Sequence, residues 1–486
     1  MVRLKLNKKQ TCTFFVVTIL LIMFTRPSPA FAAADSFSSV SAGECNTMAI
    51  KADGSLWVWG SNVRGQIGNG LAPWDPSVIP EKIMDDVASI SAGDMYSIAI
   101  KSDGSLWAWG VNGHGQLGDG TSANRSTPVK IMDNVASVSA GIDHTLAVKT
   151  DGSLWGWGSN GSGQLGDNTA TFRTTPVKIM DSVCFASAGY NHTMIIKTDG
   201  SLWALGQNSE GQLGDGTTIS RTAPEKIMDG VTAVSAGMDR SLVIKTDGSL
   251  WELGGIYVNA NGTATVCTIP VKIMDDATAV SCGAAHAMVI KTDGSLWAWG
   301  RNWCGQLGIG TSEDHTVPIK VMEGVVYVSA GSDHTMAIKT DGSLWAWGTN
   351  WAGNLGDGTQ TTRMAPIQIT TFEINVIFDR RRLAFDIPPK LYERRIMVQP
   401  QAIFQAMGAS FDWNNETKTI TAKKGDTVVR LTIGDTSPTI DGRAVAIDQP
   451  PIIVNGRMLI PLRFVAEAFG ASVSWDTETF TVTIES

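Results

Sequence analysis

Residues 138–180 read VSAGIDHTLAVKTDGSLWGWGSNGSGQLGDNTATFRTTPVKIM. The central motif of this stretch, Asp-Gly-Ser-Leu-Trp, begins at seven places in the chain: Asp53, Asp103, Asp151, Asp199, Asp247, Asp293 and Asp341. Successive copies start 50, 48, 48, 48, 46 and 48 residues apart. A period of this length indicates a repeat architecture, such as a solenoid, a propeller or an array.

Each copy has the local pattern of short β-strands. Residues 147–149 and 154–157 flank Asp151-Gly152, a turn dipeptide that favours a tight hairpin. Residues 176–179 predict another short strand after a loop. Three or four strands in each of seven units predict a mainly β fold, a seven-bladed β-propeller over residues 36–371.

Two further expectations concern packing and closure of the ring. The tryptophan after Ser-Leu recurs in all seven units, so we expect it to pack between blades, where truncation to Ala costs roughly 3–5 kcal/mol. Its copies are Trp57, Trp107, Trp155, Trp203, Trp251, Trp297 and Trp345. The last unit ends with a strand at 366–369, and we expect this strand to pair in the first blade.

The composition agrees with a scaffold of repeats. The 486 residues include 51 glycines and 17 tryptophans, and 43% are hydrophobic, which excludes a disordered chain. The glycines follow no three-residue period, so collagen is excluded as well. Residues 35–372 contain 20 basic and 32 acidic side chains, a balance that argues against binding to nucleic acid.

The first 34 residues have the pattern of a secretory signal peptide. A basic start is followed by an apolar run at 11–24, two prolines and Ala30-Phe31-Ala32. We therefore expect a secreted or cell-surface protein with no membrane span after cleavage. Five cysteines remain after residue 34, an odd number that leaves at least one thiol unpaired within the chain, and no C-x-x-C pair suggests zinc.

The remaining chain, residues 373–486, contains an internal duplication at an offset of 62 residues. Phe404 to Ser410 corresponds to Ala466 to Ser472, and Trp413 corresponds to Trp475. We expect a small α+β domain made of two copies, about 376–425 and 438–486. Each copy should contain short strands, one helix (about 400–407 and 461–469) and a hairpin.

The propeller repeats resemble those of the regulator of chromosome condensation family. The residues that carry this resemblance are A-G-x-x-H-T, D-G-S-L-W-x-W-G-x-N and G-Q-L-G-D-G-T, as at 331–350 and 115–121. The founding member is a nuclear exchange factor for a small GTPase that uses a wedge inserted into the propeller. The repeat spacings leave no room for such an insertion, so a role as an exchange factor is the less favoured interpretation.

The chain also resembles a secreted seven-bladed inhibitor of β-lactamases, which implies a ring whose one face grips a partner protein. The second module is similar to the copper amine oxidase N-terminal-like domain of secreted bacterial proteins, through the motif R-M-L-I-P-L-R-F-V-A-E-A-F-G-A at 457–471. Copper requires histidine-type ligands. Residues 373–486 contain no histidine, so we expect neither copper binding nor oxidase activity.

No motif for catalysis or a cofactor stands out. Four histidines occupy the A-G-x-x-H position, namely His144, His192, His286 and His334. Blade symmetry would keep them in separate, equivalent pockets, so we expect structural hydrogen bonds to strand backbone. The glycine-rich G-Q-L-G-D-G-T segment lacks the P-loop lysine and reads as a turn. We expect a protein that is not an enzyme and that has no cofactor and no metal.

Variable positions of the repeat supply the candidate site, because the constant positions make the scaffold. The sixth residue after each recurrent tryptophan is Val63, Gly113, Gly161, Ser209, Tyr257, Trp303 and Trp351. Three consecutive units therefore carry an aromatic side chain where the others carry a smaller one. Clustered exposed aromatics are typical of binding hot spots. The alternative is that they fill gaps between long loops.

We therefore predict partner binding over blades 5 to 7 by Tyr257, Trp303 and Trp351. Trp74 and Tyr190 are additional candidates, and Glu44, Asp94 and Met238 are further variable loop positions. The expected partner is an extracellular or envelope protein, or a cell-wall polymer, with the second module providing attachment or a second contact. The alternatives are an inhibitor of a β-lactamase or penicillin-binding protein and, less favoured, an enzyme acting on envelope polymers.

Overall fold

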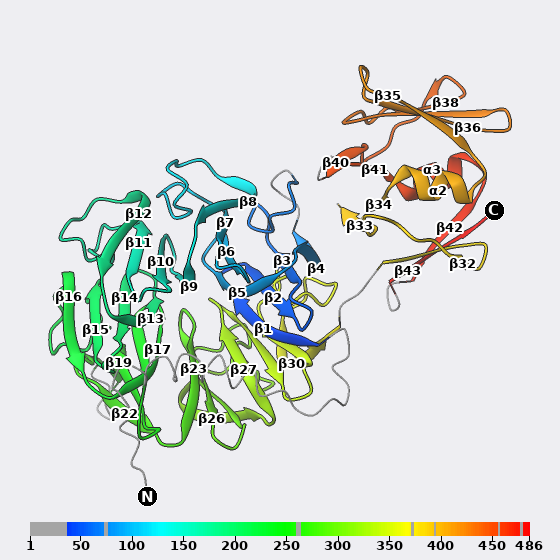
Figure 1. Ribbon diagram of the computed structural model, residues 1–486. Coiled ribbons are helices and arrows are strands. Elements are labelled where there is room, and N and C mark those ends of the chain that lie inside the picture. The colour runs from blue at the N-terminus through cyan, green and yellow to red at the C-terminus, as the bar shows by residue number, and fades with distance from the viewer. Residues whose placement is uncertain are drawn as a thin grey trace, which may run out of the picture. The chain divides into compact units, whose positions relative to one another are not determined.

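The computed structural model describes residues 36–71, 76–258, 264–370, 374–392, 395–454, 457–476 and 480–486. The predicted signal peptide and Trp74 lie outside these residues. The chain forms two compact units, of which the second contains residues 371–486. The first unit is a ring of seven four-stranded antiparallel sheets, so the predicted seven-bladed propeller is confirmed (Figure 1). No helix among the described residues is long and apolar enough to cross a membrane.

Every blade takes its four strands in chain order. The first strands are β1 (Phe37–Ala42), β5 (Val87–Ala92), β9 (Val135–Ala140), β13 (Val183–Ala188), β17 (Val231–Ala236), β23 (Ala277–Cys282) and β27 (Val325–Ala330). The second strands are β2 (Asn46–Lys51), β6 (Tyr96–Lys101), β10 (His144–Lys149), β14 (His192–Lys197), β18 (Arg240–Lys245), β24 (His286–Lys291) and β28 (His334–Lys339).

The third strands are β3 (Leu56–Gly60), β7 (Leu106–Gly110), β11 (Leu154–Gly158), β15 (Leu202–Gly206), β19 (Leu250–Gly254), β25 (Leu296–Gly300) and β29 (Leu344–Gly348). The fourth strands are β4 (Ser77–Met84), β8 (Arg125–Met132), β12 (Arg173–Met180), β16 (Arg221–Met228), β22 (Val271–Met274), β26 (His315–Met322) and β30 (Arg363–Ile369). Blade 5 adds a separate two-stranded hairpin, β20 (Ile256–Val258) with β21 (Ala264–Val266).

The Asp-Gly-Ser-Leu-Trp motif makes the turn between the second and third strands. In blade 3, Gly152 has φ +80°, and Lys149 N–H donates to Ser153 O at 2.9 Å. Ser153 Oγ donates to Asp151 Oδ1 at 2.6 Å, and the indole N–H of Trp155 donates to Ser153 Oγ at 2.9 Å. Aspartate, glycine, serine and tryptophan thus recur together because each completes the same turn.

The hydrophobic core lies between neighbouring blades. At the boundary of blades 2 and 3, Ile98 and Leu106 pack against Ala147 and Trp157. The seven-fold recurrent tryptophan, here Trp155, also lies at such a boundary, as predicted, but it is only partly buried. The second tryptophan of W-x-W, which is fully buried as Trp157, occupies the centre of the interface. The cost expected for truncating a fully buried tryptophan therefore belongs to the second one.

The predicted closure by strand exchange is wrong. The last strand, β30, pairs with β29 of its own blade 7, so no strand is left for blade 1. The ring closes instead through the serine of V-S-A-G, whose hydroxyl accepts the alanine or cysteine N–H of the following blade. The boundary between blade 7 and blade 1, where the ring closes, is called the seam. The donors are Ala92, Ala140, Ala188, Ala236, Cys282, Ala330 and, across the seam, Ala42. Ala42 N–H lies 2.9 Å from Ser329 Oγ, the same distance as at most other boundaries.

This closure predicts that the seam is as strong as any other boundary. Ser329→Ala should lower the free energy of unfolding by about 1 kcal/mol, because Ala42 N–H loses its acceptor. Ser139→Ala, which removes the bond to Ala188, is the matched control and should cost the same. Chemical denaturation measures both. A seam variant as stable as the parent would contradict closure through this bond.

The described residues of the second unit form three sheets and two helices. Its elements are β31 (Asn375–Phe378), β32 (Arg381–Arg382), β33 (Lys390–Tyr392), β34 (Arg395–Val398), α2 (Pro400–Ala406), β35 (Ser410–Asn414), β36 (Thr419–Lys424), β37 (Thr427–Thr432), β38 (Thr439–Ile440), β39 (Arg443–Ala444), β40 (Ile452–Val454), β41 (Arg457–Pro461), α3 (Leu462–Ala468), β42 (Ser472–Asp476) and β43 (Thr481–Glu485). The expected helices and hairpins are present at equivalent places in both copies.

The two copies are interlocked and share their sheets. β31 of the first copy pairs in parallel with β43, the last strand of the second copy. β36 of the first copy joins β37 and β38 in one sheet. The centre is nearly two-fold symmetric, since β34 pairs antiparallel with its own counterpart β41 at Val398 and Ile460, two positions 62 residues apart. Neither half can therefore complete its sheets by itself.

Candidate functional site

One face of the propeller carries all the variable loops. The A-G-x-x-H loops join first to second strands, and the longer loops after W-x-W-G join third to fourth strands. In an antiparallel meander both kinds of loop emerge at the same end of the sheet. We call this end the loop face. The Asp-Gly-Ser turns lie at the opposite end, the turn face.

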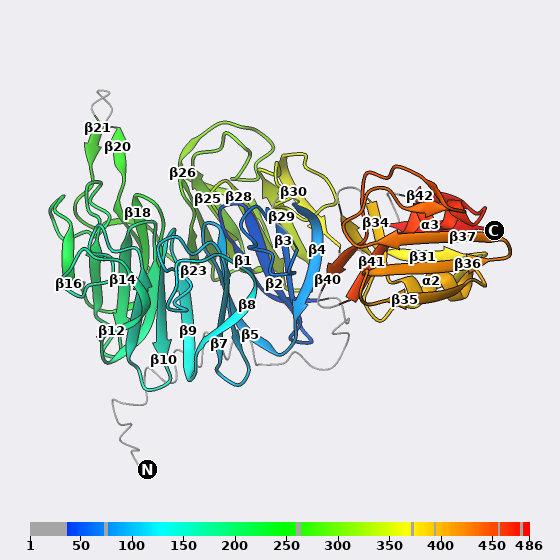
Figure 2. The ribbon, with the colours of Figure 1, turned by 90° about the horizontal axis from the view of Figure 1, so that it is seen from above.

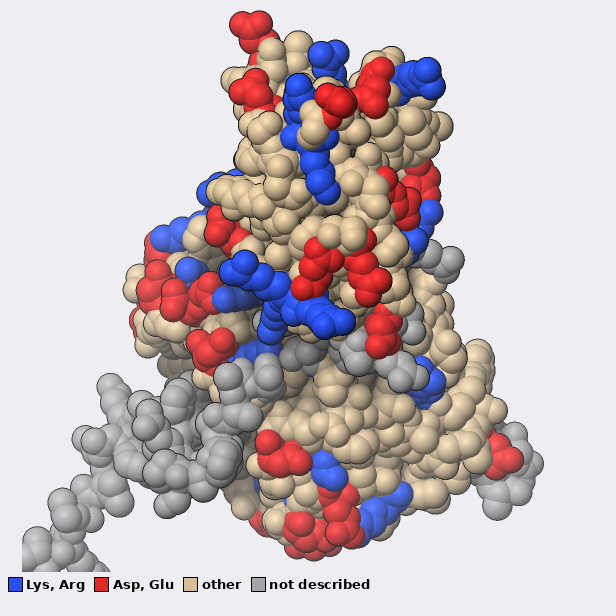
Figure 3. Space-filling view, turned by 90° about the vertical axis from the view of Figure 1, so that its right-hand side faces the viewer, with Lys and Arg blue, Asp and Glu red and all other residues tan. Residues whose placement is uncertain are grey.

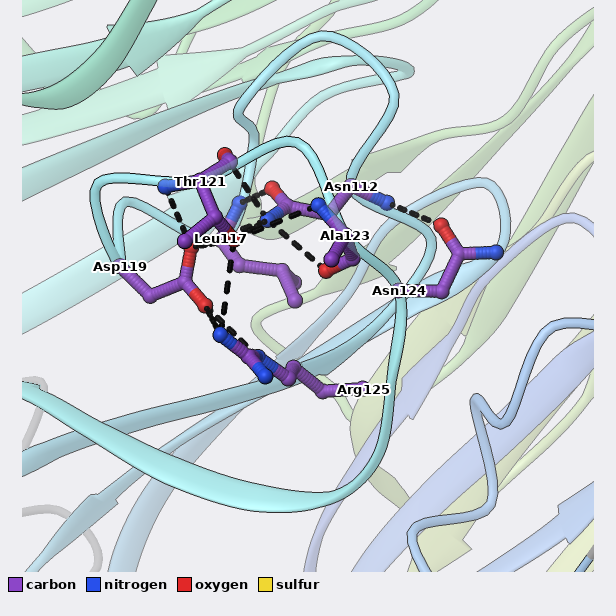
Figure 4. A network of polar contacts seen from close by, with 7 residues as sticks. All are labelled: Asn112, Leu117, Asp119, Thr121, Ala123, Asn124 and Arg125. Atoms are coloured by element: carbon purple, nitrogen blue, oxygen red, sulfur yellow. Dashed lines mark hydrogen bonds and ion pairs between the residues drawn. The ribbon is translucent and has the colours of Figure 1, made fainter.

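The long loops are held by a polar network that starts at the asparagine of W-G-x-N. In blade 2, Asn112 Nδ2 donates to Asp119 Oδ1 at 3.0 Å, and Asn112 Oδ1 accepts the N–H of Leu117 at 3.0 Å (Figure 4). Asp119 also accepts from Thr121 and forms an ion pair with Arg125 at 2.6 Å. The equivalent ion pairs in blades 3, 4 and 7 are Arg173–Asp167, Arg221–Asp215 and Arg363–Asp357.

Glycine in these loops forms turns, as expected from the sequence, and it also allows close packing. Gly118 has φ +79°, and a Cβ there would lie 2.6 Å from the indole nitrogen of Trp157 in the next blade. Each loop is therefore clamped onto its neighbour. The variable side chains consequently stand on a rigid base.

Trp303 and Trp351 project from these loops into solvent, with 65% and 61% of their surfaces exposed. At the equivalent Gly113 and Gly161, a Cβ would meet no atom within 4 Å, so this position faces open space in other blades too. Gap filling is therefore the wrong explanation for the two tryptophans. Both lie on the loop face, in blades 6 and 7.

Trp303 is held in place by charged neighbours. The guanidinium of Arg301 lies 4.8 Å from the centre of the Trp303 ring, and the indole N–H points to Asp314 Oδ2 at 3.4 Å. The other oxygen of Asp314 accepts Asn302 N–H at 2.7 Å. This arrangement reduces the side-chain freedom that Trp303 would lose on binding.

Exposed apolar side chains continue around blades 5 to 7. Met238, Ile269, Val317, Val326 and Met364 are 37–66% exposed, in addition to the two tryptophans. Ile269 and Val317 occupy a position of the fourth-strand region where blades 2 and 3 have Thr127 and Thr175. Blades 3 and 4 contribute Phe172, Phe185 and Ile219 to the same class of exposed residue.

Tyr257 differs from the other two aromatic candidates. Its backbone lies in β20, paired with Thr265 in the hairpin of blade 5, and its side chain is outside what the structure describes. The hairpin stands out from the ring in Figure 2. It takes the place of the G-Q-L-G-D-G-T loop, so a protruding element arises without any lengthening of the repeat. The spacing of the repeats by itself therefore does not exclude a protruding element in the propeller.

The centre of the loop face is a pocket of about 90 Å³ on the axis of the ring. The A-G-x segments of all seven blades line it, including Glu44, Asp94, Tyr190 and Ser332. Tyr190 of blade 4 reaches across the ring, where its hydroxyl lies 3.0 Å from Ser332 Oγ of blade 7. Three variable positions from the sequence, Glu44, Asp94 and Tyr190, thus meet at one pocket.

The carboxyl groups at this centre repel each other. Burial, together with the charges of Asp333 and Asp143, raises the pKa of Glu44. Burial raises the pKa of Asp333 as well, and Arg301 partly opposes this effect. Asp94 Oδ1 is buried without a hydrogen-bond partner.

The four A-G-x-x-H histidines are fully buried ties between blades. His192 Nε2 lies 2.8 Å from Ser241 Oγ of blade 5, and His334 Nε2 lies 3.0 Å from Thr47 Oγ1 across the seam. The expected hydrogen bond to strand backbone is wrong, because the partner is a hydroxyl of the next blade. That hydroxyl donates to a loop carbonyl, as Ser241 does to Gln212 O at 3.0 Å. The histidine must therefore donate from Nε2, which leaves Nδ1 without a proton.

In blade 5 an ion pair replaces this hydrogen bond between blades, and the sequence analysis did not predict it. Arg240 replaces the histidine, and Ala287 replaces the hydroxyl residue of blade 6. Arg240 pairs instead with the buried Glu252 at 3.0 Å, and the other oxygen of Glu252 accepts the indole N–H of Trp299 at 3.3 Å. In other blades this indole bonds to a loop carbonyl such as Gln116 O, from the segment that blade 5 lacks. The sequence does contain a signal for this ion pair, because Glu252 is a charged residue at a repeat position that the other blades fill with Val, Ala or Gly.

The remaining reactive groups form no cluster. Among the described residues, no group of three His, Cys, Asp or Glu side chains is placed to hold a metal ion. None of the five described cysteines forms a disulfide: Cys45, Cys184, Cys267, Cys282 and Cys304. In the second unit, Trp413 and Phe411 are about 40% exposed on the edge strand β35. On the face of the molecule drawn in Figure 3, basic and acidic side chains are interspersed.

Comparisons with known proteins agree with this geometry. The model of the RCC1-like domain matches residues 22–266, and models of the regulator of chromosome condensation (RCC1) repeat match residues 277–306, 293–338 and 325–352. The copper amine oxidase N-terminal domain matches residues 377–484. The search of curated proteins finds no match.

Two solved structures illustrate the likeness in fold. Human WBSCR16 is 21% identical with a TM-score of 0.59, and the match covers 65% of this chain and 94% of that one. Yeast RCC1 (Prp20), solved bound to Kap60, is 22% identical with a TM-score of 0.57, over 63% and 82% of the two chains. At these identities the likeness shows the fold alone. With seven complete blades and a family model that matches half of its length, this chain belongs to the RCC1-like domain family.

Proposed function

We propose that this protein is a secreted binding protein, without enzymatic activity, whose loop face over blades 5 to 7 grips a partner protein. The observation that carries the proposal is the exposure of Trp303 and Trp351 at one repeat position in adjacent blades, on loops that are clamped to the ring. Large exposed aromatics on a rigid base are typical of hot spots, because little side-chain freedom is lost on binding.

The partner is proposed to be an extracellular or envelope protein. The signal-peptide pattern of residues 1–34 supports export, and the acidic balance of the propeller disfavours nucleic acid. The second unit is proposed to provide attachment or a second contact, for which the exposed edge strand β35 with Phe411 and Trp413 is the best candidate. Inhibition of a β-lactamase or penicillin-binding protein is the specific alternative that such a face allows.

The double variant Trp303→Ala/Trp351→Ala tests the face. The purified chain is assayed for binding to a panel of serine β-lactamases, penicillin-binding proteins and isolated peptidoglycan. We expect a protein of this panel to bind the parent and to lose roughly a hundredfold or more in affinity for the double variant, since each hot spot contributes at least about 2 kcal/mol. The melting temperature should stay within a few degrees of the parent because both side chains are exposed.

Phe172→Ala/Ile219→Ala is the matched control, because it removes exposed apolar area from the long loops of blades 3 and 4. It should leave the affinity unchanged. Equal effects of the two double variants, or a large drop in melting temperature for the tryptophan variant, would contradict the assignment. Binding to peptidoglycan that survives both variants would point to the polymer alternative.

A further inference from the structure

The aromatic loops of blades 6 and 7 are hydrogen-bonded to the acidic centre of the loop face. In the loop of Trp351, Asn354 Nδ2 donates to Glu44 O at 3.3 Å. In the loop of Trp303, Gln306 Nε2 donates to Asp333 Oδ1 at 3.0 Å. The exposed tryptophans and the pocket on the axis therefore belong to one continuous surface.

This surface holds negative charge that neighbouring side chains offset only in part. The charged groups that act on Glu44 are Asp333 and Asp143, both acidic. Arg301, the nearby cation, acts on Asp333 and lies over the ring of Trp303. Asp94 also lines the pocket, and one of its carboxylate oxygens is buried without a hydrogen-bond partner. A positive group entering the pocket would relieve this repulsion.

The chain also shows that its tryptophans bind cations. Lysine ammonium groups lie over the recurrent tryptophans in most blades, for example Lys51 at 4.4 Å from the ring of Trp57 and Lys197 at 5.2 Å from that of Trp203. Trp303 has Arg301 in this role. Trp351 has an exposed ring without an equivalent cation among the described residues.

We propose that the partner presents a basic protein segment, whose Lys or Arg side chains enter the pocket at Glu44, which the charge of Asp333 reaches, and stack on Trp351. This inference rests on the proposed binding function and adds the chemistry of the partner. Charge complementarity favours it over an acidic partner, since the propeller region contains 32 acidic and 20 basic residues. The arrangement would combine an aromatic anchor with a half-buried carboxyl group that lies among other acidic groups.

A peptide assay tests the proposal. The probe is a dye-labelled nonapeptide of alternating Gly and Arg, and the reference is the same peptide with Glu in place of Arg. We expect the full chain to bind the Arg peptide at least tenfold more tightly, with an affinity that falls as salt is raised. Glu44→Gln/Asp333→Asn should weaken binding at least tenfold, and Trp351→Ala should weaken it several-fold.

Asp181→Asn/Asp229→Asn is the matched control. It also removes two carboxylate charges, but from exposed ion pairs on the turn face of blades 3 and 4. It should change the affinity less than twofold. Equal binding of the two peptides, or equal loss in both double variants, would overturn the proposal. Thermal melting of Glu44→Gln/Asp333→Asn distinguishes loss of the binding site from loss of the fold. Because the variant removes repulsion between carboxyl groups, its melting temperature should not fall below that of the parent.

The outcomes also separate this inference from the proposed function. If panel binding depends on Trp303 and Trp351 while the Arg peptide is ignored, only the basic chemistry is wrong. If the Arg peptide binds at Glu44 and Asp333 while panel binding does not depend on the tryptophans, the proposed protein-binding face is wrong.

Discussion

Lowering the pH from 7 to 5 is expected to reduce the free energy of unfolding by on the order of 8 kcal/mol, because four buried histidines stay neutral in the folded propeller. Burial lowers the pKa of His144 and His286 to about 3, and that of His192 and His334 to about 4. The charge of a neighbouring histidine adds to the effect at His144 and His286. Their Nδ1 atoms are buried without partners, so a proton there would have no acceptor.

The direction in which the free energy of unfolding changes with pH follows from proton uptake. An unfolded histidine titrates near pH 6.5, so below that pH the unfolded chain binds protons that the folded chain refuses. The contribution is therefore fully present above about pH 6.5 and is lost as the pH falls from there toward 4. The carboxyls of Glu44, Asp239 and Asp333, whose pKa values are raised by burial, act in the opposite direction and partly offset the loss.

Chemical denaturation at pH 7, 6 and 5 measures this slope. The variant His192→Asn tests its origin, because blade 1 already has Asn46 at the same position, with Nδ2 3.0 Å from Ser97 Oγ. The variant should lose about 1.4 kcal/mol per pH unit from the slope, the share of one proton. An unchanged slope would show that the histidines are not the acid-sensitive groups.

Glu252→Ala is expected to cost about 3 kcal/mol of stability, the second large effect. Removal of this carboxylate leaves Arg240 unpaired and only 22% exposed, and it also removes the acceptor of the Trp299 indole. In a double-mutant cycle, Arg240→Ala/Glu252→Ala should cost less than the sum of the two single variants by about 2 kcal/mol. Chemical denaturation at pH 7 gives all the required values.

The exposed pair Lys226–Asp229 in blade 4 is the control for this cycle. Its side chains are 47% and 73% exposed, and solvent screens their attraction, so its coupling should be close to zero. A coupling between Arg240 and Glu252 no larger than this control would contradict the idea that the pair replaces the missing histidine tie. The pair would then contribute no more to stability than an exposed ion pair does.

Much of the site could be recognised from the repeat, but not its geometry. The comparison of equivalent positions singled out Trp303 and Trp351, and the structure places both in solvent. It did not reveal that Tyr190 and Glu44 meet at a pocket, because residues 146 positions apart become neighbours only when the ring closes. It also left Arg240 as an unexplained deviation, since its partner Glu252 belongs to the next strand and its cause is the missing loop.

The sequence by itself determined the seven blades, their turns and the duplicated second unit, because each copy repeats the same local hydrogen bonds at a fixed spacing. Only the tertiary structure decided how the ring closes. A periodic sequence is equally compatible with exchange of the last strand and with seven self-contained blades. The choice depends on the contact between the first and last blades, where Ser329 accepts Ala42 N–H and His334 bonds to Thr47. These contacts span 287 residues, so no local pattern encodes them.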